Sequence, residues 1–232
     1  MKCWLPLDID TDFTLYNFPF GVFQIEHQKP RLASILGDNI IDLAAMNALG
    51  FFHELKIDEG VFENYFLNDF IALGKPVTNK VRSILIETFS NENSGLAVNQ
   101  EYQKLILKNV ADVTMLMPVK VGNYTDFYSS IQHATNVGTM IRDPKNALSP
   151  NYKHIPIGYH GRASSITVSG TNFFRPKGQT KPADAELPIF GPTKQLDFEL
   201  EMAFITGKST NLGQSISTHE AEEYIFGMVL FN

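Results

Sequence analysis

The strongest constraint on the fold is the alternation of apolar and acidic residues between Leu196 and Phe204. Apolar side chains fill every second position, and Asp197, Glu199 and Glu201 stand between them. Successive side chains of a β-strand point to opposite faces, so the pattern predicts a strand with one apolar face and three carboxylates on the other. Same-face neighbours lie ~6.5–7 Å apart, which lets two of them reach one cation. Such oxygen ligands suit Ca²⁺ or Mg²⁺, and a merely solvated polar face is the alternative.

The first half of the chain combines short strands with helices. Between residues 20 and 42, short apolar runs are separated by turn residues, a pattern typical of a small antiparallel meander. Apolar residues at helical spacing predict a helix over residues 77–89, and a second helix is expected over residues 99–108. Together these segments predict a separate α+β domain over residues 1–117.

The character of the chain changes near residue 117, which predicts a second domain over residues 118–232. In it we expect a helix within residues 128–140, a strand at residues 165–169, and an extended loop over residues 176–192, which hold four of the 12 prolines. The last residues, 225–232, are almost wholly apolar and predict a buried strand. Either that strand docks in a sheet at a natural terminus, or the sequence has been cut within its fold.

The composition is that of a globular protein with a substantial core. Hydrophobic residues make up 44% of the chain and charged residues 19%, which excludes a disordered chain. The net charge of −6 argues against a nucleic acid partner. The single cysteine, Cys3, implies no disulfide, and neither a signal peptide nor a membrane-spanning run is present. We therefore expect a cytoplasmic protein without a membrane or nucleic acid partner.

A second group of chemically capable side chains lies within residues 126–142. Asp126, Tyr128, His133 and Arg142 supply a possible metal ligand, a hydrogen-bond donor, a general base and an anion clamp, in a stretch with no other charge. Each also has a purely structural explanation: a turn aspartate, a half-buried tyrosine, a core histidine and a surface arginine. A Ser–His hydrolase pair is not favoured, because the chain has no Gly-x-Ser-x-Gly motif.

A third segment, Gly158-Tyr-His-Gly-Arg-Ala-Ser-Ser, has two glycines that would let the backbone wrap a ligand or simply turn. It stands with three other long motifs: Gly122-Asn-Tyr-Thr-Asp-Phe-Tyr-Ser-Ser, Gln132-His-Ala-Thr-Asn-Val-Gly and Phe226-Gly-Met-Val-Leu. Together with the 196–204 segment, these motifs resemble the fumarylacetoacetase family, and the resemblance covers essentially the whole chain.

The resemblance implies a small SH3-like N-terminal domain, followed by the first part of a mixed β-roll catalytic domain, in a cytosolic homodimer. It implies metal-dependent hydrolysis of a carbon–carbon bond in the diketo acid 4-fumarylacetoacetate, giving fumarate and acetoacetate in the last step of tyrosine and phenylalanine catabolism. It assigns a Ca²⁺ or Mg²⁺ site to Asp126, Glu199 and Glu201, the general base to His133, and substrate binding to Tyr128, Arg142 and Tyr159. Asp197 matches no ligand of the family.

Family members continue beyond the residues that match Phe231-Asn232, first with an aspartate that completes the metal site. The resemblance therefore implies an N-terminal piece of such an enzyme, expected to bind Ca²⁺ weakly and to show no hydrolysis by itself. Two alternatives stay open. One is an acylpyruvase-like hydrolase or decarboxylase of the same superfamily, although the N-terminal domain and the long motifs disfavour it. The other is an inactive metal-binding fragment.

Overall fold

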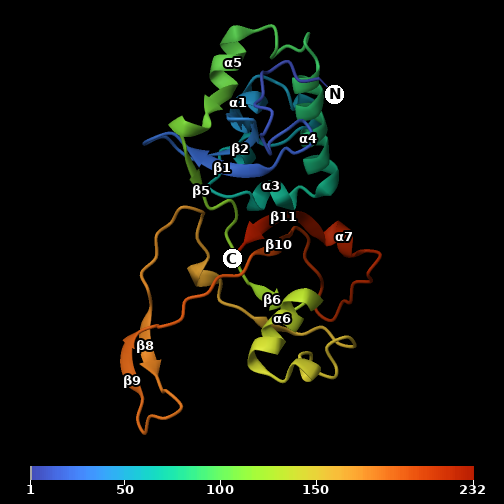
Figure 1. Cartoon of the computed structure of the whole chain (residues 1–232). Helices are drawn as coiled ribbons and strands as arrows, with labels where there is room; N and C mark the ends of the chain where they lie inside the picture. The colour runs from blue at the N-terminus through green and yellow to red at the C-terminus, as the bar shows by residue number, and fades with distance from the viewer. Residues whose placement is uncertain (1) are drawn as a thin grey trace. The chain divides into compact units, whose positions relative to one another are not determined.

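The structure, a computed structural model, describes residues 2–232 of the chain. They form two compact units: the first unit comprises Met1–Val119 and Val168–Asn232, and the second unit comprises Lys120–Thr167 (Figure 1). Helices and antiparallel strand pairs occur in both, which confirms the α+β class. The expected domain boundary near residue 117 stays a prediction. Within residues 2–232, no helix is long and apolar enough to cross a membrane.

An antiparallel sheet of five strands organises the N-terminal part of the first unit, in the order β4-β3-β2-β1-β5. The strands are β1 (Phe20–Gln24), β2 (Arg31–Leu36), β3 (Asn39–Asp42), β4 (Leu107–Asn109) and β5 (Thr114–Leu116). The meander predicted between residues 20 and 42 is thus confirmed as β1, β2 and β3. A two-residue turn joins β2 to β3, and Gly37 takes its first position with a φ of +56°, a conformation that favours glycine.

Helices of the first unit pack with this sheet and supply an aromatic core. They are α1 (Leu43–Ala48), α2 (Glu59–Phe62), α3 (Asn68–Ala72), α4 (Lys75–Ser90) and α5 (Gln100–Ile106), with the short 3₁₀ turns η1 (His53–Leu55) and η2 (Val110–Asp112). The helices predicted over residues 77–89 and 99–108 are confirmed as α4 and α5. In the core, the fully buried rings of Phe52 and Phe62 stack with their centroids 5.4 Å apart, a contact typical of a well-packed interior.

The N-terminus of α1 holds a buried carboxylate. Asp42 is 0% exposed, and its Oδ1 accepts a hydrogen bond from the backbone nitrogen of Ala45 at 3.0 Å, which caps the helix. Its Oδ2 lies 2.8 Å from Nη1 of Arg31. Burial raises the pKa of Asp42 above its ordinary value, because the loss of water around the carboxylate outweighs the backbone hydrogen bond and the attraction of Arg31 and Lys108.

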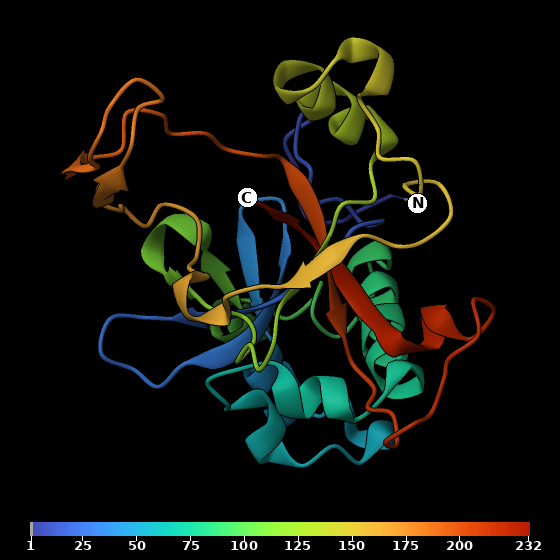
Figure 2. The same ribbon diagram turned by 90° about the horizontal axis from the view of Figure 1, so that it is seen from below.

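The first unit also contains a two-stranded antiparallel pair, β10 (Glu201–Thr206) and β11 (Ile225–Phe231), with the short helix α7 (Ala221–Tyr224) directly before β11. Figures 1 and 2 both show β11 alongside the helices of residues 68–90. Its Phe226 ring lies 6.2 Å from that of Phe20 and 6.3 Å from that of Phe70, measured between centroids. These aromatic contacts attach the C-terminal strands to the N-terminal sheet and helices.

The strand predicted over residues 196–204 is shorter than expected at its beginning. Residues 196–200 form a loop, because β11 pairs only with residues 201–206. Side chains of β10 do alternate, but Met202 and Phe204 lie on the more exposed face, at 51% and 57% exposure. Opposite them, Met228 and Leu230 are 52% and 73% exposed. The strand predicted at residues 225–232 is therefore confirmed, but the prediction that it is buried was wrong.

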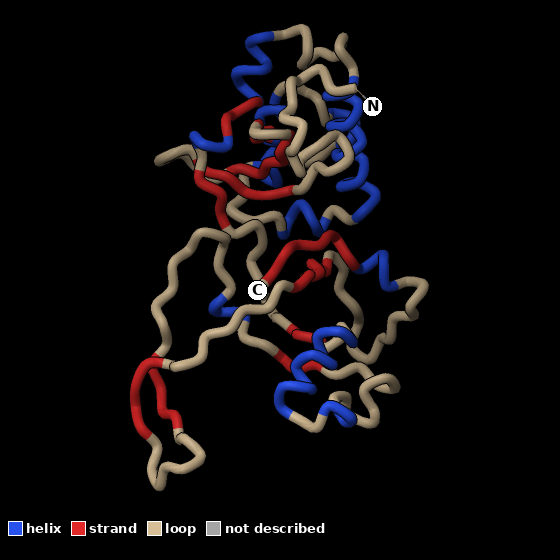
Figure 3. The backbone as a smooth tube through the Cα atoms, viewed as in Figure 1, coloured by secondary structure: helices blue, strands red, loops and turns tan. Residues whose placement is uncertain are grey.

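Two further predictions of secondary structure differ from the structure. Residues 165–169 are not a strand: a 3₁₀ turn, η4 (Ala163–Ser165), is followed by a loop. The segment has the β-branched side chains of Ile166, Thr167 and Val168, which favour a strand, but none of the described residues forms a strand that pairs with it. The loop expected over residues 176–192 contains a hairpin of β8 (Lys177–Thr180) and β9 (Ile189–Pro192). Pro192 is tolerated there because β9 is an edge strand of a two-stranded sheet. Figure 3 shows loops on both sides of this hairpin.

Candidate active site

Two short strands and one helix position the candidate residues of the second unit. Strand β6 (Thr125–Phe127) pairs antiparallel with β7 (Gly158–His160), which sets Asp126 opposite Tyr159. Helix α6 (Ile131–Ile141) follows β6 and confirms the helix expected within residues 128–140. A 3₁₀ turn, η3 (Pro144–Asn146), then packs against α6. One strand pair and one helix therefore carry three of the predicted site residues: Asp126 on β6, Tyr159 on β7 and His133 on α6.

Tyrosine hydroxyls hold the carboxylate of Asp126. The Oη atoms of Tyr124 and Tyr159 each donate a hydrogen bond to Asp126 Oδ2 at 2.9 Å. Tyr124 lies two residues before Asp126, and Tyr159 lies across the strand pair. The second oxygen, Oδ1, accepts no hydrogen bond from any residue between 2 and 232. The side chain is thus fixed in orientation, with one oxygen left to bind another group.

The two glycines of the Gly158–Gly161 segment allow a close approach to the backbone of Asp126 and to the ring of Tyr124. A Cβ atom at Gly158 would lie 2.7 Å from the carbonyl oxygen of Asp126. At Gly161 it would lie 3.2 Å from Cγ of Tyr124 and closer still to the ring edge, and the Gly161 nitrogen donates to the Tyr124 oxygen at 2.7 Å. Neither glycine has a positive φ. Residues 158–160 form a strand rather than a turn, and the glycines at 158 and 161 make room for Asp126 and Tyr124.

His133 stands in the first turn of α6, against the ring of Tyr128. The hydroxyl of Ser130 caps the helix by accepting a hydrogen bond from the His133 nitrogen at 3.2 Å. The rings of Tyr128 and His133 meet edge to face, with centroids 5.4 Å apart and planes at 87°. Tyr128 is held in turn by its backbone nitrogen, which donates to the oxygen of Ile157 at 2.8 Å. The predicted general base and a predicted substrate ligand are therefore neighbours.

Arg142 lies directly after α6 and is exposed. Its Nη1 donates a hydrogen bond to the carbonyl oxygen of Ala147 at 2.9 Å. This contact depends on Gly138, where a Cβ atom would lie 2.7 Å from the carbonyl carbon of Ala147 and closer still to its oxygen. The other donors of the guanidinium have no hydrogen-bond partner in the described part of the chain. They are available to a carboxylate, which a guanidinium binds with two parallel hydrogen bonds.

The predicted ligands Glu199 and Glu201 belong to the first unit. The backbone nitrogen of Glu199 donates to Oδ1 of Asn232 at 2.9 Å, in the loop before β10. Glu201 begins β10 opposite Phe231 and is partly buried. Among residues 2–232, no three His, Cys, Asp or Glu side chains form a group that could hold a metal ion. The ligand set of Asp126, Glu199 and Glu201 therefore stays a prediction.

Sequence reasoning missed two tyrosines of the second unit. Tyr124 is one, although its position two residues before Asp126 is a signal, because side chains two apart share a face of a strand. The other is Tyr152, whose ring lies edge to face with that of Tyr128 at 6.0 Å. Tyr152 comes from a loop far along the chain, so no local spacing links it to Tyr128.

Comparisons with known proteins match both halves of the chain. A family model described as Fumarylacetoacetase N-terminal matches residues 16–118, and one described as Fumarylacetoacetate (FAA) hydrolase C-terminal matches residues 123–232. The curated fumarylacetoacetases of Homo sapiens and Caenorhabditis elegans are each 45% identical to this chain, and the matches cover 99% and 100% of it, respectively. That of Dictyostelium discoideum is 44% identical over 100% of it.

The chain spans 55–56% of the length of these three relatives. The matches include the N-terminal domain, so they do not favour the acylpyruvase-like alternative. With both of its halves matched, the chain belongs to the fumarylacetoacetase family.

Proposed function

We propose that this protein hydrolyses the carbon–carbon bond of 4-fumarylacetoacetate to give fumarate and acetoacetate, in the catabolism of tyrosine and phenylalanine. Relatives that carry the fumarylacetoacetase name match the whole chain. The observation that carries the proposal is the pair of tyrosine hydroxyls on Asp126, in the unit that also holds His133 and Arg142. The second unit thus contains a fixed carboxylate, a candidate base and a candidate anion clamp.

The chemistry requires a way to delocalise electrons. A carbon–carbon bond breaks hydrolytically only if the leaving carbon can hold its electron pair, and the 1,3-dicarbonyl of the substrate does so as an enolate. We assign His133 the role of taking a proton from the attacking water, because an imidazole can exchange protons near neutral pH. The ring of Tyr128 keeps that imidazole in place. Arg142 pairs with a substrate carboxylate. Tyr128 and Tyr159 bind substrate oxygens, and to donate to them each hydroxyl has to release the protein oxygen to which it donates here, Ala134 O and Asp126 Oδ2 respectively.

We assign Asp126, Glu199 and Glu201 as ligands of a divalent cation, Ca²⁺ or Mg²⁺. Their oxygens are the hard ligands that these ions prefer, and Oδ1 of Asp126 accepts no hydrogen bond from residues 2–232. When bound, such a cation polarises the carbonyl oxygens of the substrate. The tyrosine hydroxyls on Oδ2 orient the carboxylate so that Oδ1 faces away from them, which is the role expected of groups behind a metal ligand.

Calorimetric titration of the 232-residue chain with Ca²⁺ tests this assignment. Asp126→Asn removes the charge of the ligand and should weaken Ca²⁺ binding at least ~10-fold, as a lost ligand or its supporting partner does. The matched control is Asp143→Asn, because Asp143 is the other aspartate of the second unit and only caps η3. Equal Ca²⁺ affinity of the two variants would refute the role of Asp126.

Three broader features complete the proposal. We infer that the five-stranded sheet belongs to an SH3-like domain, and that residues 118–232 form the first part of a mixed β-roll. The match to both domains of the family supports this assignment. We also propose a cytosolic homodimer, as the resemblance implies. Sedimentation analysis of the protein tests the dimer, and a purely monomeric species at micromolar concentration would contradict it.

A further inference from the structure

A pocket of about 330 Å³ lies within the second unit. One side consists of residues 127–129, at the end of β6, and the other of the loop residues 152–157. Backbone hydrogen bonds fix both sides: Tyr128 donates to the oxygen of Ile157 at 2.8 Å, and Tyr152 donates to the oxygen of Ser149 at 3.0 Å. The volume falls within the ~300–1,000 Å³ typical of small-molecule sites. The pocket is therefore large enough for part of a small organic molecule.

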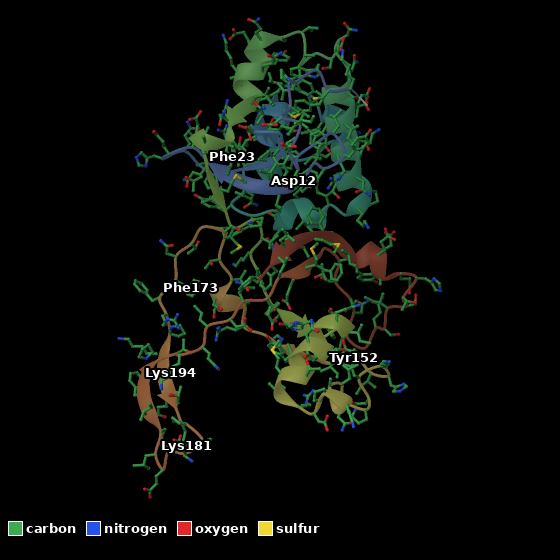
Figure 4. The ribbon with its side chains drawn as sticks, in the orientation of Figure 1. Asp12, Phe23, Tyr152, Phe173, Lys181 and Lys194 are labelled. Carbon is green, nitrogen blue, oxygen red and sulfur yellow. The ribbon has the colours of Figure 1, made fainter. Side chains whose placement is uncertain are left out.

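Tyr152 lines this pocket and has an unusual hydroxyl. Figure 4 labels Tyr152 in the second unit, and its ring packs edge to face on Tyr128 with centroids 6.0 Å apart. Its hydroxyl oxygen is buried and has no hydrogen-bond partner among the residues that the structure describes. A buried tyrosine hydroxyl normally has a partner, since leaving it unpaired is unfavourable. The unpaired hydroxyl would gain a partner if the Tyr152 side chain turned toward a polar group bound in the pocket.

The charge around the pocket indicates which polar group that is. Lys153 and His154 line it, and Lys153 forms no ion pair within residues 2–232. The second unit as a whole has five Lys or Arg residues against two Asp, although the chain carries a net charge of −6. Phe127, Ile155 and Pro156 add an apolar wall. A hydroxyl donor, a cation and an apolar wall together suit a carboxylate on a short carbon chain.

We propose that this pocket binds one carboxylate end of the substrate, with Lys153 as the opposite charge and the Tyr152 hydroxyl, which turns toward the bound carboxylate, as hydrogen-bond donor. The assignment rests on the proposed function in naming the diketo acid as the ligand. That substrate carries a carboxylate at each end, so its charge calls for a second anion-binding group besides Arg142. The apolar wall then faces the carbon chain next to the carboxylate.

Fumarate is the probe that tests the pocket, and its binding to the 232-residue chain is detected by ¹⁵N NMR. Fumarate should shift the amide signals of residues 127–129 and 152–157, whereas the neutral fumaramide should not. Tyr152→Phe keeps the ring and removes only the hydroxyl, and it should raise the dissociation constant roughly 10-fold, as expected for one hydrogen bond to a charged group. Tyr65→Phe, at an exposed tyrosine of the first unit, is the matched control and should change nothing.

Lys153→Met should also weaken fumarate binding and should make the binding less dependent on salt concentration. Lys145→Met is the control, because Lys145 is a lysine of the same unit that does not line the pocket. Because Lys153 is exposed, this variant keeps the test open even if Tyr152→Phe unfolds the second unit. Wild-type affinity in both pocket variants, or equal binding of fumaramide, overturns the proposal. Turnover of 4-fumarylacetoacetate is measured separately, on the protein expressed from its whole coding sequence. Turnover there without fumarate shifts at the pocket refutes the pocket but not the reaction, and pocket shifts without turnover by that longer protein refute the reaction but not the pocket.

Discussion

Gly138→Ala should destabilise the second unit, although helix propensity alone predicts the opposite. Gly138 lies in the interior of α6, where alanine is favoured over glycine by ~1 kcal/mol. The added Cβ atom would lie 2.7 Å from the carbonyl carbon and 3.0 Å from the Cα of Ala147. Ordinary contacts between such atoms are ~3.5–4.0 Å, so α6 and Ala147 must move about 1 Å apart.

That movement has two costs. Overpacking of this kind costs ~1–3 kcal/mol. Separation of the segments also breaks the hydrogen bond from Arg142 to the Ala147 oxygen, for about 1 kcal/mol, and exposes Ala147, which is 6% exposed in the structure. After the ~1 kcal/mol gain in helix propensity is subtracted, α6 should lose about 1–3 kcal/mol of stability.

Hydrogen exchange measured by mass spectrometry on peptides that cover residues 131–142 gives this quantity directly. Gly122→Ala is the control, because no atom lies within 4 Å of the position its Cβ would take. Trp4, the one tryptophan, stacks on Phe89 in the first unit, so its fluorescence should be unchanged in both variants. Unchanged or slower exchange in α6 of Gly138→Ala would refute the close approach to Ala147.

Two further predictions concern charge and packing. In the wild type, the contribution of Asp42 to the unfolding free energy should decrease as the pH rises above the ordinary Asp pKa of ~3.9. In Asp42→Asn this decrease should disappear. The raised pKa of Asp42 means that the folded chain holds the proton more tightly than the unfolded chain, so protonation stabilises the fold at low pH and this stabilisation is lost as pH rises. Urea titrations at several pH values give the unfolding free energy of the wild type and of Asp42→Asn. If the two free energies change equally with pH, the reasoning is wrong. Gly161→Ala should push the ring of Tyr124 away from Asp126 and weaken Ca²⁺ binding several-fold in calorimetry. Wild-type affinity would show that Tyr124 does not orient the ligand.

Local patterns in the sequence predicted several elements of the N-terminal part of the chain well. The meander of β1 to β3 and the helices α4 and α5 follow from short-range alternation and helical spacing, which neighbouring residues determine. Strands that depend on a distant partner were harder. Residues 165–169 have β-branched side chains but no partner among residues 2–232, and residues 196–200 lie beyond the reach of β11. Pairing is decided by tertiary structure, so propensity alone overestimated both strands.

The candidate site was predictable as a set of residue types but not as a set of contacts. Asp126, Tyr128 and His133 were identified from their chemistry, and the structure places Tyr128 against His133. The strand pair that brings Tyr159 to Asp126 joins segments far apart in sequence, so no spacing rule indicated the hydrogen bond. For the same reason Tyr152 went unnoticed, because its significance lies in a pocket and not in a motif.

The most direct test of the proposed reaction is turnover of 4-fumarylacetoacetate by the protein expressed from its whole coding sequence, with and without His133→Ala. Loss of a general base should lower kcat at least ~100-fold. Ca²⁺ binding, measured by calorimetry on the same samples, should be unchanged, because His133 is not among the proposed ligands. Turnover by the variant at a rate near that of the wild type would contradict the account.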